Sequence, residues 1–268
     1  RFWTKALRDL GYVNYNEPFT KLFNQGMLHG EDGEKMSKSK GNVILPEVVS
    51  EKYGIDTARF FLMSLAAPDK PRDWSDKGVQ GSLKFINKVI DYFDNVKIGK
   101  SDERTESKLN KTIKDVTEYI ENFKYNLAVI KLRELFNFLP SKTSKDVLEK
   151  SLKLLHPFCP HITEELWEKI GNKNFITLEK WPVVDEKKIN EKFEKEEEAI
   201  EKLGSDINYL KKLTGKKGKV YVYVLPNEIE FYKNFEGIEL FAVNDKNKYD
   251  PENKSKKAKP GKPGIYLE

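Results

Sequence analysis

The sequence predicts a mostly α-helical protein with an antiparallel helix bundle at its centre and a small α+β domain at its C-terminal end. Apolar residues recur every three or four positions from about residue 76 to residue 170, as in helices that bury one face. Short connections between these segments favour antiparallel neighbours. The pattern then changes to the strict alternation of "VYVYVL" at 220–225, which indicates a strand.

These changes in pattern divide the chain into four segments. Residues 1–72 hold a lysine-rich loop and two connecting helices, residues 73–184 the bundle, residues 185–215 a charged linker, and residues 216–268 the terminal domain. The linker mixes Glu and Lys densely with few apolar positions, so we expect a solvated helix. In the terminal domain, "IEFY" and "IELFAV" are further strand candidates.

Within the first segment, the sequence predicts a helix over residues 2–10 and a buried strand in the apolar run "LFNQGML" at 22–28. Pro46 suits the first turn of a helix that ends at Gly54. Asp56 is placed to cap the helix that follows it.

Composition limits the classes of protein to which the chain can belong. Its 268 residues are 38% hydrophobic and 34% charged, which suits a soluble chain with a core. No apolar run approaches the roughly 20 residues of a membrane span. The single Cys159 excludes a disulfide framework and a four-cysteine zinc site, and it fits a reducing, cytoplasmic setting. The net charge of +5 weakly favours a polyanionic partner.

The most informative stretch is "EDGEKMSKSKGN" at 31–42. Its lysines and serines lie between glycines, so we expect a mobile loop that can close on a phosphate chain. When ATP adenylates a carboxylate, negative charge builds on the departing pyrophosphate, and lysine ammonium groups stabilise it there. Lys35 and Lys38 are the candidate cations, and Ser37 and Ser39 the candidate hydroxyl donors. Lysine-rich loops are more often merely solvated, so the residues alone leave both interpretations open.

The string "KMSKS" at 35–39 resembles the signature loop of class I aminoacyl-tRNA synthetases. "GNVILPEVVSEKYGIDTARFFLMS" is similar to the part of that family that links the catalytic and anticodon domains. "LLHPFCPHITEELWEKIG" resembles the closing helices of the anticodon-binding bundle in the leucyl, isoleucyl and valyl branch. "LFNQGMLHG", "RFWTKALRDLG" and "KPGKPGIYLE" resemble leucyl-tRNA synthetase of the archaeal and eukaryotic-cytosolic type.

This resemblance implies an anticodon-binding helix bundle that follows the end of a nucleotide-binding catalytic domain. It also implies an enzyme that activates leucine with ATP and Mg²⁺ and transfers it to tRNA-Leu. Lys38 would matter most for the transition state, with Lys35 assisting. We expect no metal bound by this chain and no membrane partner. The implied ATP-binding residues are Lys35, Met36, Ser37, Lys38 and Ser39.

The family's other catalytic element, of the His-Ile-Gly-His type, is missing from the sequence. The histidines are His29, His156 and His161, and none has that context. The editing domain and most of the nucleotide-binding sheet are also missing, and the chain does not start with Met. We therefore expect the C-terminal part of a longer synthetase, inactive alone and partnered by the N-terminal catalytic part. For the three histidines we expect packed structural roles rather than metal binding.

Aromatic residues have a structural and a functional interpretation. Trp167 and Trp181 are expected to pack in the bundle. Trp74 is expected either beneath the lysine loop or, as we favour, at the domain junction. Helical spacing predicts core packing rather than base stacking for a further set of aromatic residues. These are Phe123, Phe136 and Phe138.

Basic stretches towards the C-terminal end form the candidate tRNA-binding surface. In a protein that handles tRNA, phosphate contact is at least as good an interpretation of these lysines as plain solvation. One tyrosine is a candidate to stack on exposed bases. The candidates are Lys211, Lys212, Lys216, Lys217, Lys219, Lys254, Lys256, Lys257, Lys259, Lys262 and Tyr266.

Two other interpretations stay open. The chain could be the same region of a valyl or isoleucyl enzyme, although the missing zinc cysteines and the ending "KPGKPGIYLE" argue against this. It could also be a standalone tRNA-binding module without a catalytic role, in which "KMSKS" is a relic.

Overall fold

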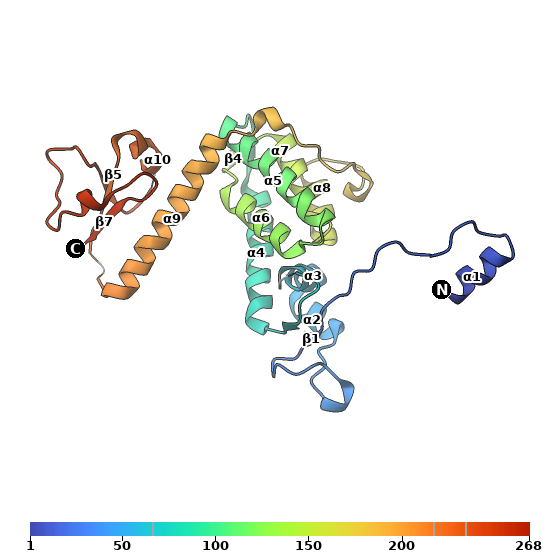
Figure 1. Ribbon diagram of the computed structural model, residues 1–268. Helices are drawn as coiled ribbons and strands as arrows, with labels where there is room; N and C mark the ends of the chain where they lie inside the picture. Colours follow the sequence, from blue (N-terminus) through green and yellow to red (C-terminus); the bar gives the residue numbers. More distant parts are fainter. Residues whose placement is uncertain (66, 217, 234) are drawn as a thin grey trace. The chain divides into compact units, whose positions relative to one another are not determined.

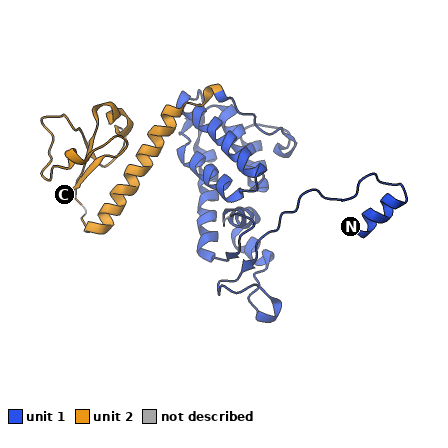
Figure 2. Cartoon of the chain, in the orientation of Figure 1, with its two compact units in different colours: residues 1–186 blue, residues 187–268 orange. Residues whose placement is uncertain are grey.

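The structure is a computed structural model that describes residues 1–65, 67–216, 218–233 and 235–268. It divides into two compact units, residues 1–186 and residues 187–268 (Figure 1, Figure 2). The described residues contain ten α-helices, so the mostly helical fold predicted from the sequence is confirmed.

The start of unit 1 has little secondary structure. Helix α1 (Phe2–Asp9) buries no residue, and residues 10–27 form neither helix nor strand. The buried strand expected at 22–28 is wrong, because the side chain of Leu22 is 83% exposed. Its apolar composition predicted burial, but Leu22, Phe23 and Met27 are exposed, and Leu28 alone of its large apolar side chains packs against a core. The only strand here is β1 (Leu28–His29), which pairs in parallel with β2 (Arg72–Asp73).

Helices α2 (Pro46–Tyr53) and α3 (Ile55–Ser64) lie where the sequence predicts them. Proline occupies the first turn of α2, and Gly54 separates the helices with a φ of +84°, a conformation that suits glycine. Helix α3 contributes to two different cores. Phe60 packs into the core of the following helices, whereas Phe61 packs with Trp74 beneath the lysine loop.

Asp56 does not cap its own helix, contrary to the expectation from the sequence. Its buried carboxylate reaches helix α8, where it accepts a hydrogen bond from the backbone N–H of Ile162 at 2.8 Å. The other oxygen lies 2.9 Å from Nδ1 of His161, whose side chain is 70% exposed and is therefore not the packed histidine expected. The carboxylate does cap a helix start, but one supplied by tertiary packing 106 residues away.

Five helices pack around the main hydrophobic core of unit 1. Ser75, Asp102 and Ser144 each accept a hydrogen bond from a backbone N–H group in the first turn of the helix that follows. A short parallel pair joins β3 (Lys97–Ile98) and β4 (Lys142–Thr143). The helices are α4 (Asp76–Asn95), α5 (Glu103–Glu121), α6 (Tyr125–Phe138), α7 (Lys145–Leu155) and α8 (Pro160–Lys169). The 3₁₀ helices η2 (Ile176–Leu178) and η3 (Glu186–Lys188) follow them.

The aromatic residues of this region differ in burial. Trp167 and Phe136 are buried in the core, as the helical spacing predicts, and Phe138 is half-buried. Trp181 is 36% exposed, and its Nε1–H donates to a threonine hydroxyl of α5 at 2.8 Å. Phe123 lies beyond the end of α5 with a φ of +57°, so it does not continue the helical core pattern.

Unit 2 is a three-stranded sheet in the order β6-β5-β7. Strand β5 (Val220–Val224) is parallel to β6 (Glu239–Ala242) and antiparallel to β7 (Gly264–Leu267). The strand expected at "IEFY" is wrong, because these residues form the short helix α10 (Ile229–Tyr232). The 3₁₀ helix η4 (Pro226–Glu228), which proline begins, runs directly into it and so prevents an extended conformation.

Helix α9 (Glu191–Thr214) occupies the segment for which the sequence predicts a solvated linker, but one of its faces is buried. Leu203 is 0% and Ile207 5% exposed, and both belong to the core that Val222 and Leu267 of the sheet complete. The dense Glu and Lys content indicates the solvated face correctly and conceals the sparse apolar positions of the packed face. No described helix is both long and apolar enough to cross a membrane.

Replacing Leu203 by alanine is therefore expected to destabilise unit 2 by about 2–5 kcal/mol, because it leaves a cavity in a closed core. The control is Leu213→Ala on the same helix, where the side chain is 67% exposed and the expected change is about 0.5 kcal/mol or less. Hydrogen exchange of the β5 amides measures both. Equal protection in the two variants would mean that α9 does not pack on the sheet.

Candidate functional site

The lysine-rich loop leaves β1 and returns to α2 as a folded, hydrogen-bonded segment. Its motif residues Lys35, Met36, Ser37, Lys38 and Ser39 are all described. The N–H of Met36 donates to the carbonyl of Leu28 at 3.4 Å, and Lys35 forms an isolated antiparallel bridge with His29. The 3₁₀ helix η1 (Lys38–Lys40) ends at a glycine with a φ of +69°. The loop thus has more structure of its own than its glycines indicated.

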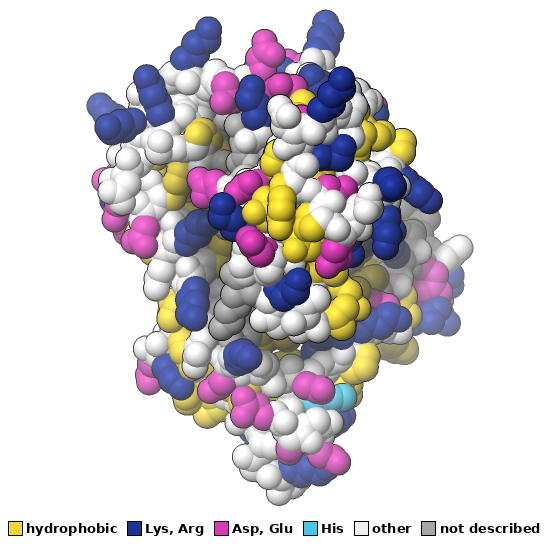
Figure 3. Space-filling model, turned by 90° about the vertical axis from the view of Figure 1, so that its left-hand side faces the viewer, with side chains coloured by type: hydrophobic (Ala, Val, Ile, Leu, Met, Phe, Trp, Pro, Cys, Tyr) yellow, Lys and Arg dark blue, Asp and Glu magenta, His cyan; other side chains and the backbone are white. Residues whose placement is uncertain are grey.

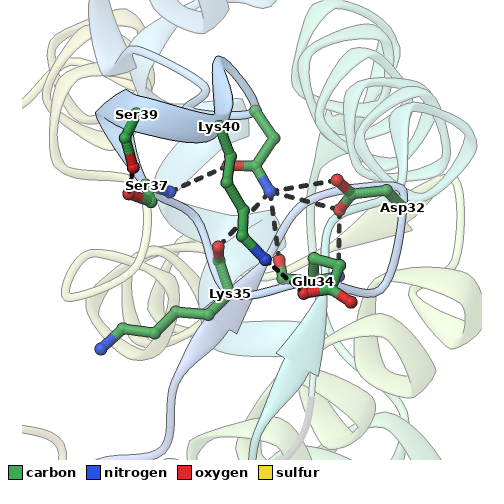
Figure 4. Close-up of polar contacts among 7 residues, drawn as sticks. Asp32, Glu34, Lys35, Ser37, Ser39 and Lys40 are labelled. Atoms are coloured by element: carbon green, nitrogen blue, oxygen red, sulfur yellow. Dashed lines mark hydrogen bonds and ion pairs between the residues drawn. The ribbon is translucent and has the colours of Figure 1, made fainter.

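The side chain of Asn42 lies at the centre of the loop's polar contacts. Its Oδ1 accepts a hydrogen bond from the backbone N–H of Ser37 at 2.8 Å, and its Nδ2 donates to Asp32 at 3.1 Å. Asp32 also accepts from the backbone N–H of Glu34 at 3.0 Å (Figure 4). These two donors, the Glu34 N–H first, hold the pKa of the Asp32 carboxyl below its usual value.

The three lysines of the loop differ in their partners. Nζ of Lys40 lies 2.5 Å from the Glu34 carboxylate, which raises the pKa of Lys40 (Figure 4). The side chain of Lys35 points away from this acidic group (Figure 4). Lys38 is exposed, and neither it nor Lys35 has an ion-pair partner among the described residues. Two cations of the loop are therefore available to an anion, and the third is neutralised.

The other motif residues make contacts within unit 1. The hydroxyls of Ser37 and Ser39 lie 2.8 Å apart and bond each other. Met36 is half-buried against the small core that contains Trp74, Phe61 and Val79. The sequence left two places open for Trp74, beneath the lysine loop or at the domain junction. Both descriptions fit, because the core that contains Trp74 packs against Met36 of the loop and also joins α3 to α4.

A cavity of about 440 Å³ lies between the end of the loop and α2. Glu31, Asp32 and Asp76 contribute carboxylates to its lining, and Lys52 contributes the only cation of its described lining residues. This excess of acidic groups makes the cavity a poor place for a phosphate chain. Across the described residues, no three His, Cys, Asp or Glu side chains converge as metal ligands would. His29 bonds Asp73 at 2.9 Å, in line with a structural role.

The basic candidates of unit 2 fall into paired and exposed residues. Nζ of Lys216 donates to the carbonyl of Leu267 at 2.7 Å and lies 5.5 Å from the ring centre of Tyr266. Lys219 pairs with Glu239 at 2.9 Å. Lys254 pairs with a glutamate, and Lys217 lies outside the described residues. The exposed candidates without an ion-pair partner among the described residues are Lys211, Lys212, Lys256, Lys257, Lys259 and Lys262.

The turn at residues 259–262 holds the last of these lysines in place. Lys259 and Lys262 exchange two backbone hydrogen bonds of 2.9 and 2.8 Å. The N–H of Gly261, at the tip, donates to the buried carboxylate of Glu228 at 2.7 Å. Lys256 and Lys257 belong to the neighbouring 3₁₀ helix η5 (Lys254–Lys257). No local pattern signals the role of Glu228, because only the fold brings it to this turn.

Tyr266 lies in a group of aromatic rings rather than alone. Its ring centre is 5.8 Å from that of Tyr221 and 6.2 Å from that of Tyr249, which is 47% exposed. The alternation of "VYVYV" could have signalled Tyr221, since it places tyrosines on one face of the strand. Figure 3 shows basic and acidic side chains interspersed over one face of the molecule, rather than one continuous basic surface.

Two family models match the chain. Residues 1–74, which include the loop, match "tRNA synthetases class I (I, L, M and V)". Residues 102–220 match "Anticodon-binding domain of tRNA ligase". With the folded KMSKS loop and the helices that follow it, these matches place the chain in the class I aminoacyl-tRNA synthetases.

Within that class, the chain is a homologue of the leucine–tRNA ligases. It is 41% identical over 213 residues to the leucine–tRNA ligase of Thermotoga petrophila, a match over 70% of this chain and 26% of the relative. It is 38% identical to that of Geobacter sp. strain M21, over 84% of this chain and 32% of the relative. The chain therefore spans about a quarter to a third of the length of these relatives. Both are bacterial, so they give no support to the archaeal and eukaryotic-cytosolic type expected.

A solved structure is similar as well. LeuRS of Agrobacterium radiobacter K84, crystallised in a ternary complex with tRNA and LeuAMS, matches with a TM-score of 0.63 and 32% identity. The match covers 71% of this chain and 27% of that one.

Proposed function

We propose that this chain supplies the ATP-clamping loop and the tRNA-binding domains of a cytoplasmic leucine–tRNA ligase. The complete enzyme activates leucine with ATP and Mg²⁺ and transfers it to tRNA-Leu. The observation that carries the proposal is the loop itself. Two lysines of a class I signature motif are free of ion pairs within the described chain, while the third is held by Glu34. In this proposal, α4–α8 form the antiparallel anticodon-binding bundle and unit 2 an α+β tRNA-binding domain.

The proposed chemistry is adenylation. The leucine carboxylate attacks the α-phosphorus of ATP, a bond to the bridging oxygen breaks, and pyrophosphate leaves with the accumulated negative charge. Lys38 and Lys35 stabilise that charge as it develops, which lowers the barrier because an ammonium group in place needs no reorganisation. Ser37 and Ser39 contribute hydroxyl donors once their mutual hydrogen bond opens. Mg²⁺ bound to ATP would supply further positive charge to the phosphates.

The proposed partner of unit 1 is the nucleotide-binding part of the synthetase that carries the His-Ile-Gly-His-type element. Its support is the number of large apolar side chains that unit 1 leaves exposed between residues 3 and 62, because exposed apolar surface beyond scattered single residues marks an interaction site. They include Trp3 (73% exposed), Phe19 (81%), Leu22 (83%), Leu45 (52%), Val48 (57%) and Leu62 (45%).

The chain alone is expected to catalyse no leucine-dependent exchange of pyrophosphate into ATP, because its sequence holds only one of the two catalytic elements. Addition of a separately produced nucleotide-binding part should restore exchange. The assay follows labelled pyrophosphate with leucine present and absent. Exchange by the pure chain would contradict the divided active site.

Within a complete enzyme, Lys38→Ala is expected to slow adenylation roughly 10²–10³-fold, as for the loss of one preorganised charge partner of a transition state. Lys114→Ala is the matched control. It removes only an exposed ion pair with Glu186 outside the loop, worth about 1 kcal/mol or less, so the rate should fall less than about fivefold. The KM for leucine should not change in either variant. A silent Lys38→Ala beside a crippling Lys35→Ala would reverse the assigned roles.

The tRNA-binding role of unit 2 is tested by salt. Binding of tRNA-Leu to this chain should weaken with salt, by about one unit of log–log slope for each phosphate contact. Replacing both Lys256 and Lys257 by alanine should lower the slope by about two. The control is Lys195→Ala on α9, which pairs with Glu191 and is not a candidate. Binding that is independent of salt, or equal losses in both variants, would refute the role.

A further inference from the structure

The hydrogen bonds that fold the KMSKS loop converge on a residue outside the motif. Asn42 follows η1 and the glycine that ends it, and its amide reaches back to both sides of the loop. On one side, it accepts from the Ser37 N–H at the centre of the motif. On the other, it donates to Asp32 at the loop's entrance. One side chain thus connects the start, the middle and the end of the loop.

We propose that Asn42 is a positioning residue that holds this loop in the conformation in which Lys35 and Lys38 are free for phosphate. The inference rests on the proposed adenylation function for its catalytic consequence. The geometry of the loop itself does not depend on that function and can be measured in this chain.

The residue type fits the two tasks. A neutral side chain that accepts at one atom and donates at another must be an amide, or a histidine with a much larger ring. Asp32 is a fixed partner, because its Oδ1 accepts from the Glu34 N–H and lies against Gly30. A Cβ atom at Gly30 would come within 2.7 Å of that oxygen, so this buried glycine leaves the carboxylate its place.

Because charged side chains surround Asn42, its hydrogen bond to Asp32 also affects whether Lys35 and Lys38 stay free. Asp32 and Glu34 are satisfied by the Asn42 amide, a backbone N–H and Lys40. Without the amide, the Asp32 carboxylate loses a donor and becomes a competing partner for the free lysines nearby. The Ser37 N–H simultaneously loses its acceptor. Both changes oppose the state in which the motif's ammonium groups are available to pyrophosphate.

A swap of the two side chains tests the contact directly. Asn42→Asp places two carboxylates against each other and should open the loop. Adding Asp32→Asn restores a donor and an acceptor in exchanged positions, and the amide oxygen introduced at position 32 can still accept from the Glu34 N–H. The double variant should therefore recover most of the loss, as coupled residues do in a double-mutant cycle.

The first measurement uses this chain alone. Trypsin cleaves after lysine, so cleavage after Lys35 and Lys38 reports how often the loop opens. Asn42→Asp and Asn42→Ala should each accelerate cleavage on the order of tenfold, the equivalent of one hydrogen bond to a charged group. The swap variant should return to the original rate. The control is Asn122→Ala at the C-terminal cap of α5, whose amide donates to the carbonyl of Glu118 and whose loss should change nothing in the loop.

The second measurement uses the complete enzyme carrying the same substitutions. Asn42→Asp should lower kcat of leucine-dependent exchange about tenfold with an unchanged KM for leucine, and the swap should restore kcat. Unchanged cleavage, or a swap without rescue, overturns the inference whatever the function is. Normal exchange by Asn42→Asp, where Lys38→Ala is crippled, also overturns it. If neither Lys38→Ala nor Lys35→Ala slows exchange while Asn42→Asp still opens the loop, the proposed function fails and the positioning of the loop stands.

Discussion

The buried carboxylate of Asp56 is the contact on which the arrangement of unit 1 depends. A charge that is removed from water must be hydrogen-bonded, and here the only described partners lie at the start of α8. Consecutive residues of the same helix α3 strengthen this connection, because Phe60 enters the main core and Phe61 the core beneath the loop. Helix α3 thereby joins the core beneath the loop to the helices that match an anticodon-binding domain.

Two acidic side chains of the loop have partners within it, whereas two of its three lysines have no ion-pair partner among the described residues. Asp32 bonds Asn42, Glu34 bonds Lys40, and the side chain of Lys35 points away from them (Figure 4). The core beneath the loop fixes Met36 and leaves the ammonium groups in solvent. A phosphate-binding loop needs this division, because a lysine already paired with a carboxylate in the same loop must lose that partner before it can bind phosphate.

The two faces of the sheet in unit 2 carry different side chains. Valines of β5 face α9 and form the core with Leu203 and Ile207. Tyrosines alternate with them on the other face, where Tyr221 and Tyr266 approach Tyr249 from the loop that crosses this side. Tyr249, the exposed ring of this group, belongs to the same unit as the lysines of η5 and of the 259–262 turn.

The sequence by itself determined the helical character, the positions of α2 and α3, strand β5 and the signature motif of the KMSKS loop. Each of these follows from local causes: periodicity, proline and glycine positions, and a motif of contiguous residues. It did not determine the exposure of residues 22–27, the partner of Asp56, the packed face of α9 or the helix at "IEFY". Those depend on which segments far apart in the chain come together. Only the tertiary structure decided the roles of Asn42 and Glu228, since a hydrogen bond needs its partner in place and spacing alone does not name that partner.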